Sequence, residues 1–480
     1  MTGYGCGNAT ADPPTVPAPI PPDDPGAWYA PRVRDQQEVH PGIVVTIRTS
    51  DREFVYDVRE PPLTATEQRT LQRVEEYFAD ARLDRPRTRE GAVERMERGF
   101  QPKHGRVLDR LVDCSHAARR RVEYHALRSM ACLGALTPYA LDSRIEVADV
   151  ADDGLVVHTN DYAPAETDLP ADPAFIDRFA SERIERHTVS FHGFDVPVVL
   201  YRENLLGSDP FTTKYAVREP DLLPGDEALI EECKERIWEA RVDGILDDEI
   251  DFVRDRARSL LARRLTVRNT RAWIDAVRYR VRSALAEYDL AVPPLDRRFD
   301  DDRLDDLLYY VLRDYVGYGK LTVPIHDPTL EDIEANRVGE RIKVVPRIDV
   351  DHDGRIPTNL AFEDERTFVN VVTRLAADDG TELNASTPSA KVNLELDAAD
   401  GLTGDSEKIR CAVALPTISE DGPHISIRKQ SADVLTPVDL VDGGTLPPEL
   451  VALLWQFYEF HGVVLFCGPT GVGKTTLMNA

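Results

Sequence analysis

Long apolar runs are missing from this 480-residue sequence, which has no uninterrupted stretch of about 18 apolar residues, the length that a membrane-spanning helix needs. The amino terminus also lacks a basic segment followed by an apolar core, which is the pattern of a secretory signal. The six cysteines are few and irregularly spaced, which argues against a disulfide framework. These absences predict a soluble, intracellular protein with reduced thiols and no direct insertion into a membrane.

Positive charge is also scarce. The sequence has 58 basic residues, nine of them lysine, against 85 acidic residues, and its net charge is −27. A surface this acidic repels nucleic acid, so we expect no nucleic-acid partner. The acidic residues are spread along the whole chain, which favours adaptation to a high-salt cytosol. An acidic protein of an ordinary cytosol is the alternative.

Composition and hydrophobic periodicity divide the chain into five parts and predict a multidomain fold of mixed α/β and α+β character. The first part is rich in proline and cannot bury enough surface to fold. The helical segment is either an arm that contacts a partner or a structural subdomain. The parts are a disordered tail at 1–31, a mixed α/β domain at 32–225, a helical segment at 226–300, an α+β domain at 301–430, and a linker, helix and core start at 431–480.

Local patterns predict individual elements. Thr64 or Thr66, with Glu67 nearby, can cap a helix over 64–81. Expected helices are 105–134, three within 226–290, 304–316, 364–376 and 447–460, the last packing Leu450, Leu453, Leu454 and Phe457 on the residues after it. Expected strands are 44–47, 54–58, two hairpins over 145–158 and 188–201, then 321–325, 331–336, 342–346, 392–396, 409–415, 424–427 and 463–466. Residues 202–226 and 436–444 are predicted to be connectors.

A group of cysteine and histidine residues lies in the pattern over 105–134: Cys114, His116, His125 and Cys132. Thiolate and imidazole are ligands of zinc, so a metal site is one interpretation. The spacing does not bracket a turn with paired ligands, and Arg119-Arg120-Arg121 between them has the character of a solvated helix face. Reduced core cysteines with surface histidines are therefore the favoured interpretation.

The strongest motif comes directly after the apolar residues 463–467. It has the pattern Gly-x-x-x-x-Gly-Lys-Thr of a phosphate-binding P-loop, in which glycines let backbone N–H groups converge on phosphate. Lys474 would reach the β- and γ-phosphates of ATP, and the hydroxyl of Thr475 would coordinate Mg²⁺. The predicted nucleotide-binding residues are Gly468, Pro469, Thr470, Gly471, Val472, Gly473, Lys474, Thr475 and Thr476.

Several shorter motifs precede the P-loop in a specific order. They are Tyr315-Val316-Gly317-Tyr318-Gly319, Asp327-Pro328-x-x-Glu331-Asp332-Ile333-Glu334, Pro357-Thr358-Asn359 and Ile425-Ser426-Ile427-Arg428-Lys429. With the P-loop, this order resembles the secretion-superfamily ATPases, the motors of type II and type IV secretion, type IV pili and the archaellum. The resemblance covers 303–480 and, given the acidic, arginine-rich composition, favours the archaeal and salt-adapted branch.

The resemblance implies a PAS-like domain at 301–430 ahead of a RecA-like ATPase core. It also implies that Arg374, Arg410 and Arg428 lean over the nucleotide and act with Lys474 in catalysis, since guanidinium groups stabilise charge on phosphate oxygens. The turn before Arg410 departs from the family pattern. The implied assembly is a hexameric ring of identical subunits in the cytoplasm, at the inner face of the membrane, working with an integral membrane platform protein.

The family's acidic strand, acidic box and histidine box come after the P-loop and are absent from this sequence, so we expect nucleotide binding but no appreciable hydrolysis by this chain alone. The remainder could be a separate chain, follow an intein, or not exist. The leading hypothesis is an ATP-driven assembly motor. The alternatives are a non-catalytic scaffold subunit of the same machine and another P-loop kinase or translocase. The machine served, the ring size and the direction of the motor stay open.

Overall fold

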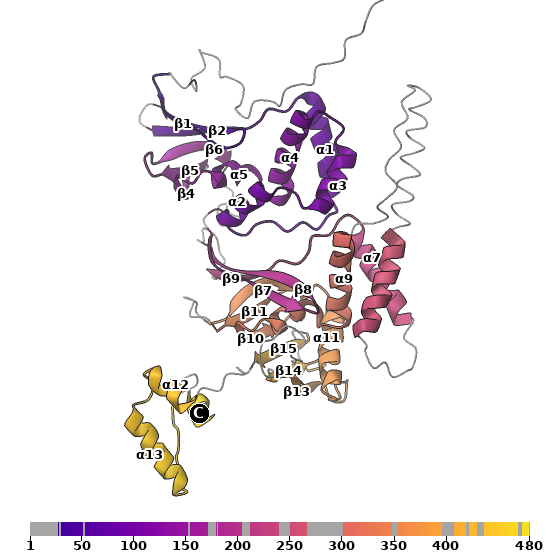
Figure 1. The fold of residues 1–480 in the computed structure, drawn as a ribbon, viewed down its shortest axis with the longest axis vertical. Coiled ribbons are helices and arrows are strands. Elements are labelled where there is room, and N and C mark those ends of the chain that lie inside the picture. The colour runs from indigo at the N-terminus through magenta and orange to yellow at the C-terminus, as the bar shows by residue number, and fades with distance from the viewer. Residues whose placement is uncertain are drawn as a thin grey trace, which may run out of the picture. The chain divides into compact units, whose positions relative to one another are not determined.

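The computed structural model shows a mixed α/β chain that divides into two units (Figure 1). Unit 1 holds residues 1–325, 341–344 and 350–362, and unit 2 holds 326–340, 345–349 and 363–480. The structure describes residues 27, 30–50, 53–151, 154–170, 179, 181–203, 212–239, 250–265, 301–347, 354–395, 408–418, 422–429, 436–468 and 473–479. Most of the predicted tail at 1–31 and the third predicted helix, within 266–300, lie outside these residues. The five predicted domain boundaries stay predictions.

Unit 1 begins with a six-stranded sheet in the order β1-β2-β3-β6-β5-β4 (Figure 1). Its strands are β1 (Val33–His40), β2 (Ile43–Ser50), β3 (Glu53–Arg59), β4 (Ile145–Ala151), β5 (Gly154–Thr159) and β6 (Ala165–Pro170). The β4–β5 hairpin is as predicted, because the Asp-Gly pair follows alternating apolar residues. Val45, Tyr56 and Val157 of this sheet are fully buried in one core cluster.

Helices follow β3 in the chain, and three of them share a second core. They are α1 (Ala65–Phe78), α2 (Arg89–Arg98), α3 (Pro102–Leu111), α4 (His116–Ala131) and α5 (Thr137–Leu141). The predicted cap of α1 is confirmed: Thr64 accepts a hydrogen bond from the Glu67 backbone, and the Glu67 carboxylate accepts one from the Thr64 N–H. Val74, Leu108 and Val122 pack α1, α3 and α4 together.

The prediction of one helical pattern over 105–134 was wrong, because two helices cover it. Val112 has extended backbone angles, and Ser115 accepts a hydrogen bond from Ala118 N–H to start α4. Helix α2 was not predicted. Its N-cap is Thr88, whose side chain accepts a hydrogen bond from Gly91 N–H.

A second group of strands belongs to unit 1, except for the last two residues of β11 (Arg341–Pro346), which are assigned to unit 2. Strands β7 (Glu182–Phe191), β8 (Phe194–Arg202) and β9 (Thr213–Val217) are antiparallel neighbours, and β9 pairs in parallel with β12 (Ile356–Ala361), which pairs with β11. The β7–β8 hairpin is as predicted. The prediction of a connector over 202–226 was wrong, because all five residues of β9 are buried between two strands. The described helices here are α7 (Asp226–Glu239), helical residues 250–265, and α9 (Asp301–Tyr315).

The segment after α9 was predicted as a strand over 321–325, and this prediction was wrong. A 3-10 turn, η2 (Gly319–Leu321), leads into the short helix α10 (Thr322–His326). The hydroxyl of Thr322 accepts a hydrogen bond from Tyr318 N–H and donates one to Arg313 C=O. A side chain on Gly317 would collide with Thr322. A short apolar run fits a helix and a strand equally, and these hydrogen bonds favour the helix.

A buried ion cluster joins the end of β9 to α9 inside unit 1. The Glu219 carboxylate forms ion pairs with Arg313, Arg82 and Lys320, with N–O distances of 2.5, 3.2 and 3.3 Å. These cations lower the pKa of Glu219 to about 2 although burial opposes the shift. The guanidinium of Arg313 also lies over the ring of Tyr310, 4.8 Å from its centroid.

Unit 2 has a four-stranded antiparallel arrangement in the order β13-β14-β15-β10. The strands are β10 (Leu330–Ala335), β13 (Ser389–Glu395), β14 (Lys408–Ala414) and β15 (His424–Lys429), and helix α11 (Glu365–Asp378) packs on β13 and β14. Phe368, Val372 and Leu375 of α11 are buried, as are Ile409 and Cys411 of β14. These elements match the predicted α+β order closely.

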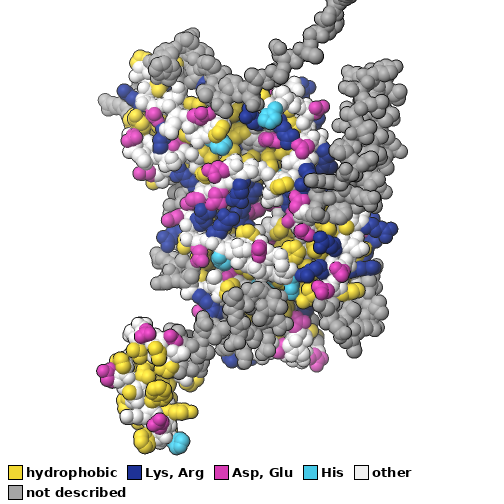
Figure 2. All heavy atoms as spheres, in the orientation of Figure 1, with side chains coloured by type: hydrophobic (Ala, Val, Ile, Leu, Met, Phe, Trp, Pro, Cys, Tyr) yellow, Lys and Arg dark blue, Asp and Glu magenta, His cyan; other side chains and the backbone are white. Residues whose placement is uncertain are grey.

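The last elements of unit 2 are α12 (Pro437–Asp442), α13 (Pro448–Glu459) and α14 (Lys474–Asn479). The predicted linker over 436–444 was wrong, because Thr436 and Asp439 form a capping box that starts α12. Helix α13 is as predicted, but the expected packing of its apolar face is not observed. Leu450, Leu453 and Phe457 are exposed, and Figure 2 shows hydrophobic side chains gathered over α12 and α13.

Candidate nucleotide site

The described part of the P-loop sequence consists of Gly468, Gly473 and the helix α14, which begins at Lys474. Gly473 has φ +77, a backbone conformation that disfavours residues with a side chain, and its C=O accepts a hydrogen bond from Leu477 N–H at 2.9 Å. The glycine directly before the lysine thus provides the turn into a helix that the motif requires. Pro469, Thr470, Gly471 and Val472 lie outside the described residues, as do the side chains of Thr475 and Thr476.

The apolar residues 463–466 before the P-loop do not form the predicted strand. Val463 is 97% exposed and Leu465 is 82% exposed. No described residue pairs with this segment, and a strand without a hydrogen-bonding neighbour is not stable in water.

Two of the predicted arginines are neighbours on the exposed face of the unit 2 sheet. Arg410 of β14 is directly opposite Arg428 of β15 in the antiparallel register. Alternate residues on these strands, such as Ile409 and Ile427, are buried on the opposite face. The sheet therefore presents both guanidinium groups to solvent.

The row across the sheet continues on both sides of the arginine pair. Asn393 of β13 is opposite Arg410, and Asp332 of β10 is opposite Arg428. Arg428 donates from Nε and Nη2 to the two carboxylate oxygens of Asp332, both at 2.9 Å, and this bond raises the pKa of Arg428. The side chain of Arg410 is exposed and forms no hydrogen bond or ion pair with any residue that the structure describes.

Adjacent like charges on neighbouring strands repel each other. Asp332 neutralises one member of the pair, so Arg410 keeps a charge that no described residue compensates. A row of amide, two guanidinium groups and a carboxylate can bind a phosphate oxygen through the arginines, because a guanidinium presents paired N–H donors to such oxygens.

The third predicted arginine, Arg374, lies elsewhere in the unit. It belongs to α11, which packs against the buried face of β13 and β14, whereas Arg410 and Arg428 stand on the exposed face. Its Nε and Nη2 atoms are shielded from solvent. The sheet thus brings Arg410 and Arg428 together but not Arg374.

Two sequence motifs about a hundred residues apart meet where β10 begins and β15 ends. The Lys429 side chain is buried, and its Nζ donates a hydrogen bond to the C=O of Asp327 at 2.6 Å. Arg347 donates to the C=O of Leu330 at 3.0 Å and to the C=O of Lys429 at 3.2 Å. These bonds fix β15 against β10 and so hold Arg428 opposite Asp332.

Asp332 and Asn393 belong to this row but were not predicted as site residues. The alternation along β10 and β15 was the available signal, since it puts Asp332 and Arg428 on solvent-facing positions. Their pairing depends on the strand register, which the sequence does not display.

The alternative zinc site is not formed. Nε2 of His125 is 2.8 Å from the C=O of Pro61, and Cys132 is buried with its Sγ 3.7 Å from the C=O of Ala92. Cys114 is exposed at the surface. Among the residues that the structure describes, no group of three or more His, Cys, Asp or Glu side chains is placed to hold a metal ion.

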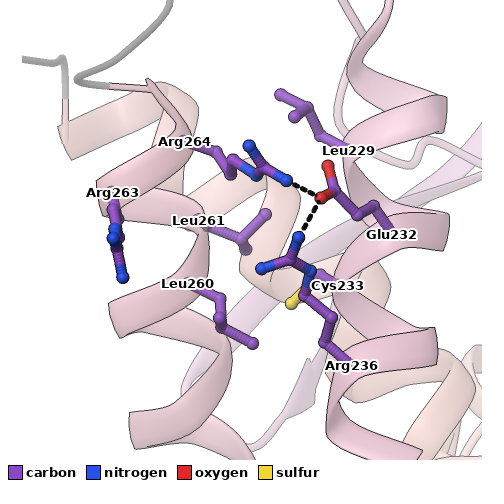
Figure 3. A pocket seen from close by; sticks show the side chains of 8 residues that line it. All are labelled: Leu229, Glu232, Cys233, Arg236, Leu260, Leu261, Arg263 and Arg264. Carbon is purple, nitrogen blue, oxygen red and sulfur yellow. Dashed lines mark hydrogen bonds and ion pairs between the residues drawn. The ribbon is translucent and has the colours of Figure 1, made fainter.

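A cavity of about 310 Å³ lies between α7 and helical residues 250–265 (Figure 3). Leu229, Leu260 and Leu261 line it, and the Glu232 carboxylate receives both Arg236 and Arg264. Burial raises the pKa of the Cys233 thiol to about 12, so this cysteine is protonated and unsuited to nucleophilic chemistry. The residues that line the cavity pack and form ion pairs as at an ordinary contact between two helices.

Comparison with known proteins relates part of this chain to a protein family. Residues 329–480 match the sequence model of the family described as type II/IV secretion system protein. The carboxy-terminal third of the chain is therefore similar to the type II/IV secretion proteins. The matched region contains the arginine row of the sheet as well as the P-loop sequence.

Curated relatives match part of the chain. An uncharacterized protein of Methanocaldococcus jannaschii is 30% identical over 191 residues, which are 38% of this chain and 32% of that protein. A second uncharacterized protein of the same organism is 29% identical over 43% of this chain and 26% of its own length. A Mycobacterium tuberculosis protein named for conjugal transfer is 27% identical over 27% of this chain and 36% of its own length. The chain thus spans about a third of the relatives that it matches.

Among solved structures, the VirB11 ATPase from the Brucella suis type IV secretion system, crystallised with sulphate, is 19% identical. The alignment covers 35% of this chain and 50% of that chain, with a TM-score of 0.20.

Within the described residues of the present chain, no helix is long and apolar enough to cross a membrane.

Proposed function

We propose that this chain is part of an ATP-driven motor of the type II/IV secretion class. The observation that carries the proposal is the family match over 329–480, because that region holds both the P-loop sequence and the paired arginines. In this proposal the machine is one that assembles a pilus or archaellum or moves macromolecules across a membrane.

In this proposal the residues of the site have different chemical roles. Backbone N–H groups of 468–476 bind the phosphates of ATP, Lys474 contacts the β- and γ-phosphates, and the Thr475 hydroxyl binds Mg²⁺. Arg410 and Arg428 supply positive charge to phosphate oxygens, where charge develops during phosphoryl transfer. Arg374 lies on α11, on the other side of the sheet, so its proposed contribution is indirect.

The proposed assembly is a hexameric ring of copies in the cytoplasm. It works at the inner face of the membrane on an integral membrane platform protein. A motor of this kind hydrolyses ATP as one subunit closes on the next, which explains why a sheet would carry exposed arginines such as Arg410. The archaeal, salt-adapted origin stays a prediction from composition.

The test is ATP binding and turnover by the chain with and without the Lys474→Ala substitution, at high and low salt. Loss of the lysine removes a charged contact to phosphate, so we expect ATP affinity to fall at least about tenfold. Arg110→Ala removes an exposed positive charge from α3 and serves as the control. Undiminished ATP binding by Lys474→Ala would reject the nucleotide site.

The oligomer is tested separately by sedimentation velocity with and without Mg²⁺ and ATP. The proposal expects a six-subunit species in the nucleotide-bound sample. A monomer under every condition at which ATP is bound would contradict the ring but leave the nucleotide site standing.

A further inference from the structure

A second pocket, of about 250 Å³, lies wholly within unit 1 and far along the sequence from the P-loop. Three arginines line it, Arg82, Arg85 and Arg87, from the segment between α1 and α2. The segment after β9, Tyr310 of α9 and Asn359 of β12 form the rest of the wall. None of these residues belongs to the proposed nucleotide site.

Backbone hydrogen bonds hold the arginine segment in place. Arg82 N–H donates to the C=O of Leu222 and Leu222 N–H donates to the C=O of Arg82, both at 2.9 Å. Asp84 N–H donates to the Asp221 carboxylate at 2.6 Å. The pocket wall is therefore ordered before any ligand arrives, which reduces the entropic cost of binding.

The carboxylates that line this pocket already have cationic partners. Asp84 forms an ion pair with Arg218 at 2.7 Å, and Glu219 forms one with Arg313 at 2.5 Å. Asp221 lies 3.9 Å from Arg95. These outer arginines offset part of the negative charge of the pocket, and of the three arginines between α1 and α2 only Arg82 forms an ion pair with one of these carboxylates, Glu219.

Two of those three arginines keep most of their charge available. Arg87 forms no hydrogen bond or ion pair with a residue that the structure describes, and Arg85 donates Nη2 to a neutral acceptor, the C=O of Ser129, at 2.9 Å. Arg82 shares the Glu219 carboxylate with two other cations.

We propose that this pocket binds a phosphate group, as inorganic phosphate or as a small phosphate monoester. Three guanidinium groups at one pocket suit a doubly charged oxyanion, because each offers paired N–H donors in a fixed plane. The volume is below the usual range for drug-sized ligands, roughly 300–1,000 Å³, and favours a small anion over a peptide segment. The assignment does not depend on the proposed motor function.

The experiment uses the 480-residue chain carrying Lys474→Ala, so that the P-loop does not contribute phosphate binding. Isothermal titration calorimetry measures binding of inorganic phosphate and of glycerol 3-phosphate. Co-flotation with phosphatidylcholine vesicles, with and without phosphatidic acid, tests whether the phosphate can come from a lipid headgroup. Arg87→Ala and Arg85→Ala are compared with Arg110→Ala, the exposed control on α3.

We expect phosphate or monoester binding that weakens about tenfold in Arg87→Ala and in Arg85→Ala, the loss of one charged hydrogen bond, and is unchanged in Arg110→Ala. Arg87→Lys should recover part of the affinity, because it restores the charge without the planar fork. Binding to phosphatidic acid vesicles that depends on Arg87 would identify a lipid headgroup as the source.

Three results would overturn the proposal. They are no measurable binding of any of the phosphate probes, equal binding by the parent and Arg87→Ala, or an equal loss in Arg110→Ala. Thermal melting of each variant confirms that a loss of binding does not come from unfolding. Arg87 is half-buried and has no described partner, so its replacement should leave the melting temperature within about a degree of the parent.

Discussion

Two arginine clusters in this molecule have opposite characters. In unit 1, Arg313 is buried, forms an ion pair with Glu219 at 2.5 Å and lies over the ring of Tyr310. In unit 2, Arg410 stands in solvent directly across from Arg428, with no described partner of its own. The buried cluster pairs Arg313 with Glu219 and, at 2.6 Å, with Asp314, and so contributes to the fold. In the exposed pair Arg428 is bound to Asp332, whereas the charge of Arg410 has no described partner and is available to a ligand.

The largest expected effect comes from breaking the buried cluster. Glu219→Ala removes the buried carboxylate from Arg313 and leaves it only Asp314, at 2.6 Å, so we expect the free energy of unfolding to fall by about 3–5 kcal/mol. Denaturant unfolding followed by circular dichroism measures the change. A loss below about 1 kcal/mol would show that the cluster does not stabilise the fold.

The pH dependence of stability sharpens the same point. Its neighbours lower the pKa of Glu219 to about 2 from an ordinary 4.5. The stabilisation is therefore fully present above about pH 5 and is lost as pH falls towards 2, for a total of roughly 3 kcal/mol. Unfolding of the parent and of Glu219→Gln at pH 6 and pH 3 isolates this contribution. Parallel losses in the two proteins would assign the acid sensitivity to other groups.

The exposed pair should affect binding and not folding. Arg410→Ala is expected to weaken ATP binding about tenfold, by loss of one charged contact, and to change the free energy of unfolding by less than about 0.5 kcal/mol. Fluorescence titration with a labelled ATP analogue measures the affinity, with Arg110→Ala as the control. A large drop in stability would place Arg410 with the structural arginines.

The smallest expected effect comes from the carboxylate beside the pair. Asp332→Asn removes the charge that holds Arg428, and an exposed ion pair contributes about 1 kcal/mol or less to stability. The released guanidinium should tighten ATP binding by a few-fold, measured in the same titration. Weaker binding in Asp332→Asn would mean that Asp332 positions Arg428 for the phosphate.

Local signals in the sequence predicted some elements accurately. The cap at Thr64 and the hairpins depend on neighbouring residues, and both are present. The short apolar run at 321–325 was predicted to be a strand. The hydrogen bonds that favour a helix there, from Thr322 to Arg313 and from Tyr318 to Thr322, depend on tertiary packing and could not be predicted from the sequence. Strand β9 was missed because it is buried on both sides and shows no alternation.

The candidate site, like the fold, could be predicted from the sequence only in part. The P-loop and the three arginines could be selected from the sequence by motif and by resemblance. That Arg410 and Arg428 face each other, while Arg374 lies on the opposite side of the sheet, depends on register and on helix packing. Their roles in nucleotide chemistry stay predictions.

Strand β9 has a consequence for synthesis of the chain. Its partner β12 is attached through Asn359, whose amide accepts a hydrogen bond from the N–H of Val217 and donates one to its C=O, both at 2.8 Å. Asn359 comes 142 residues after Val217, so a ribosome adding about 5–20 residues per second needs roughly 7–28 seconds to deliver it. Through that interval the nascent chain carries an open strand edge, and this is when a chaperone would protect it most.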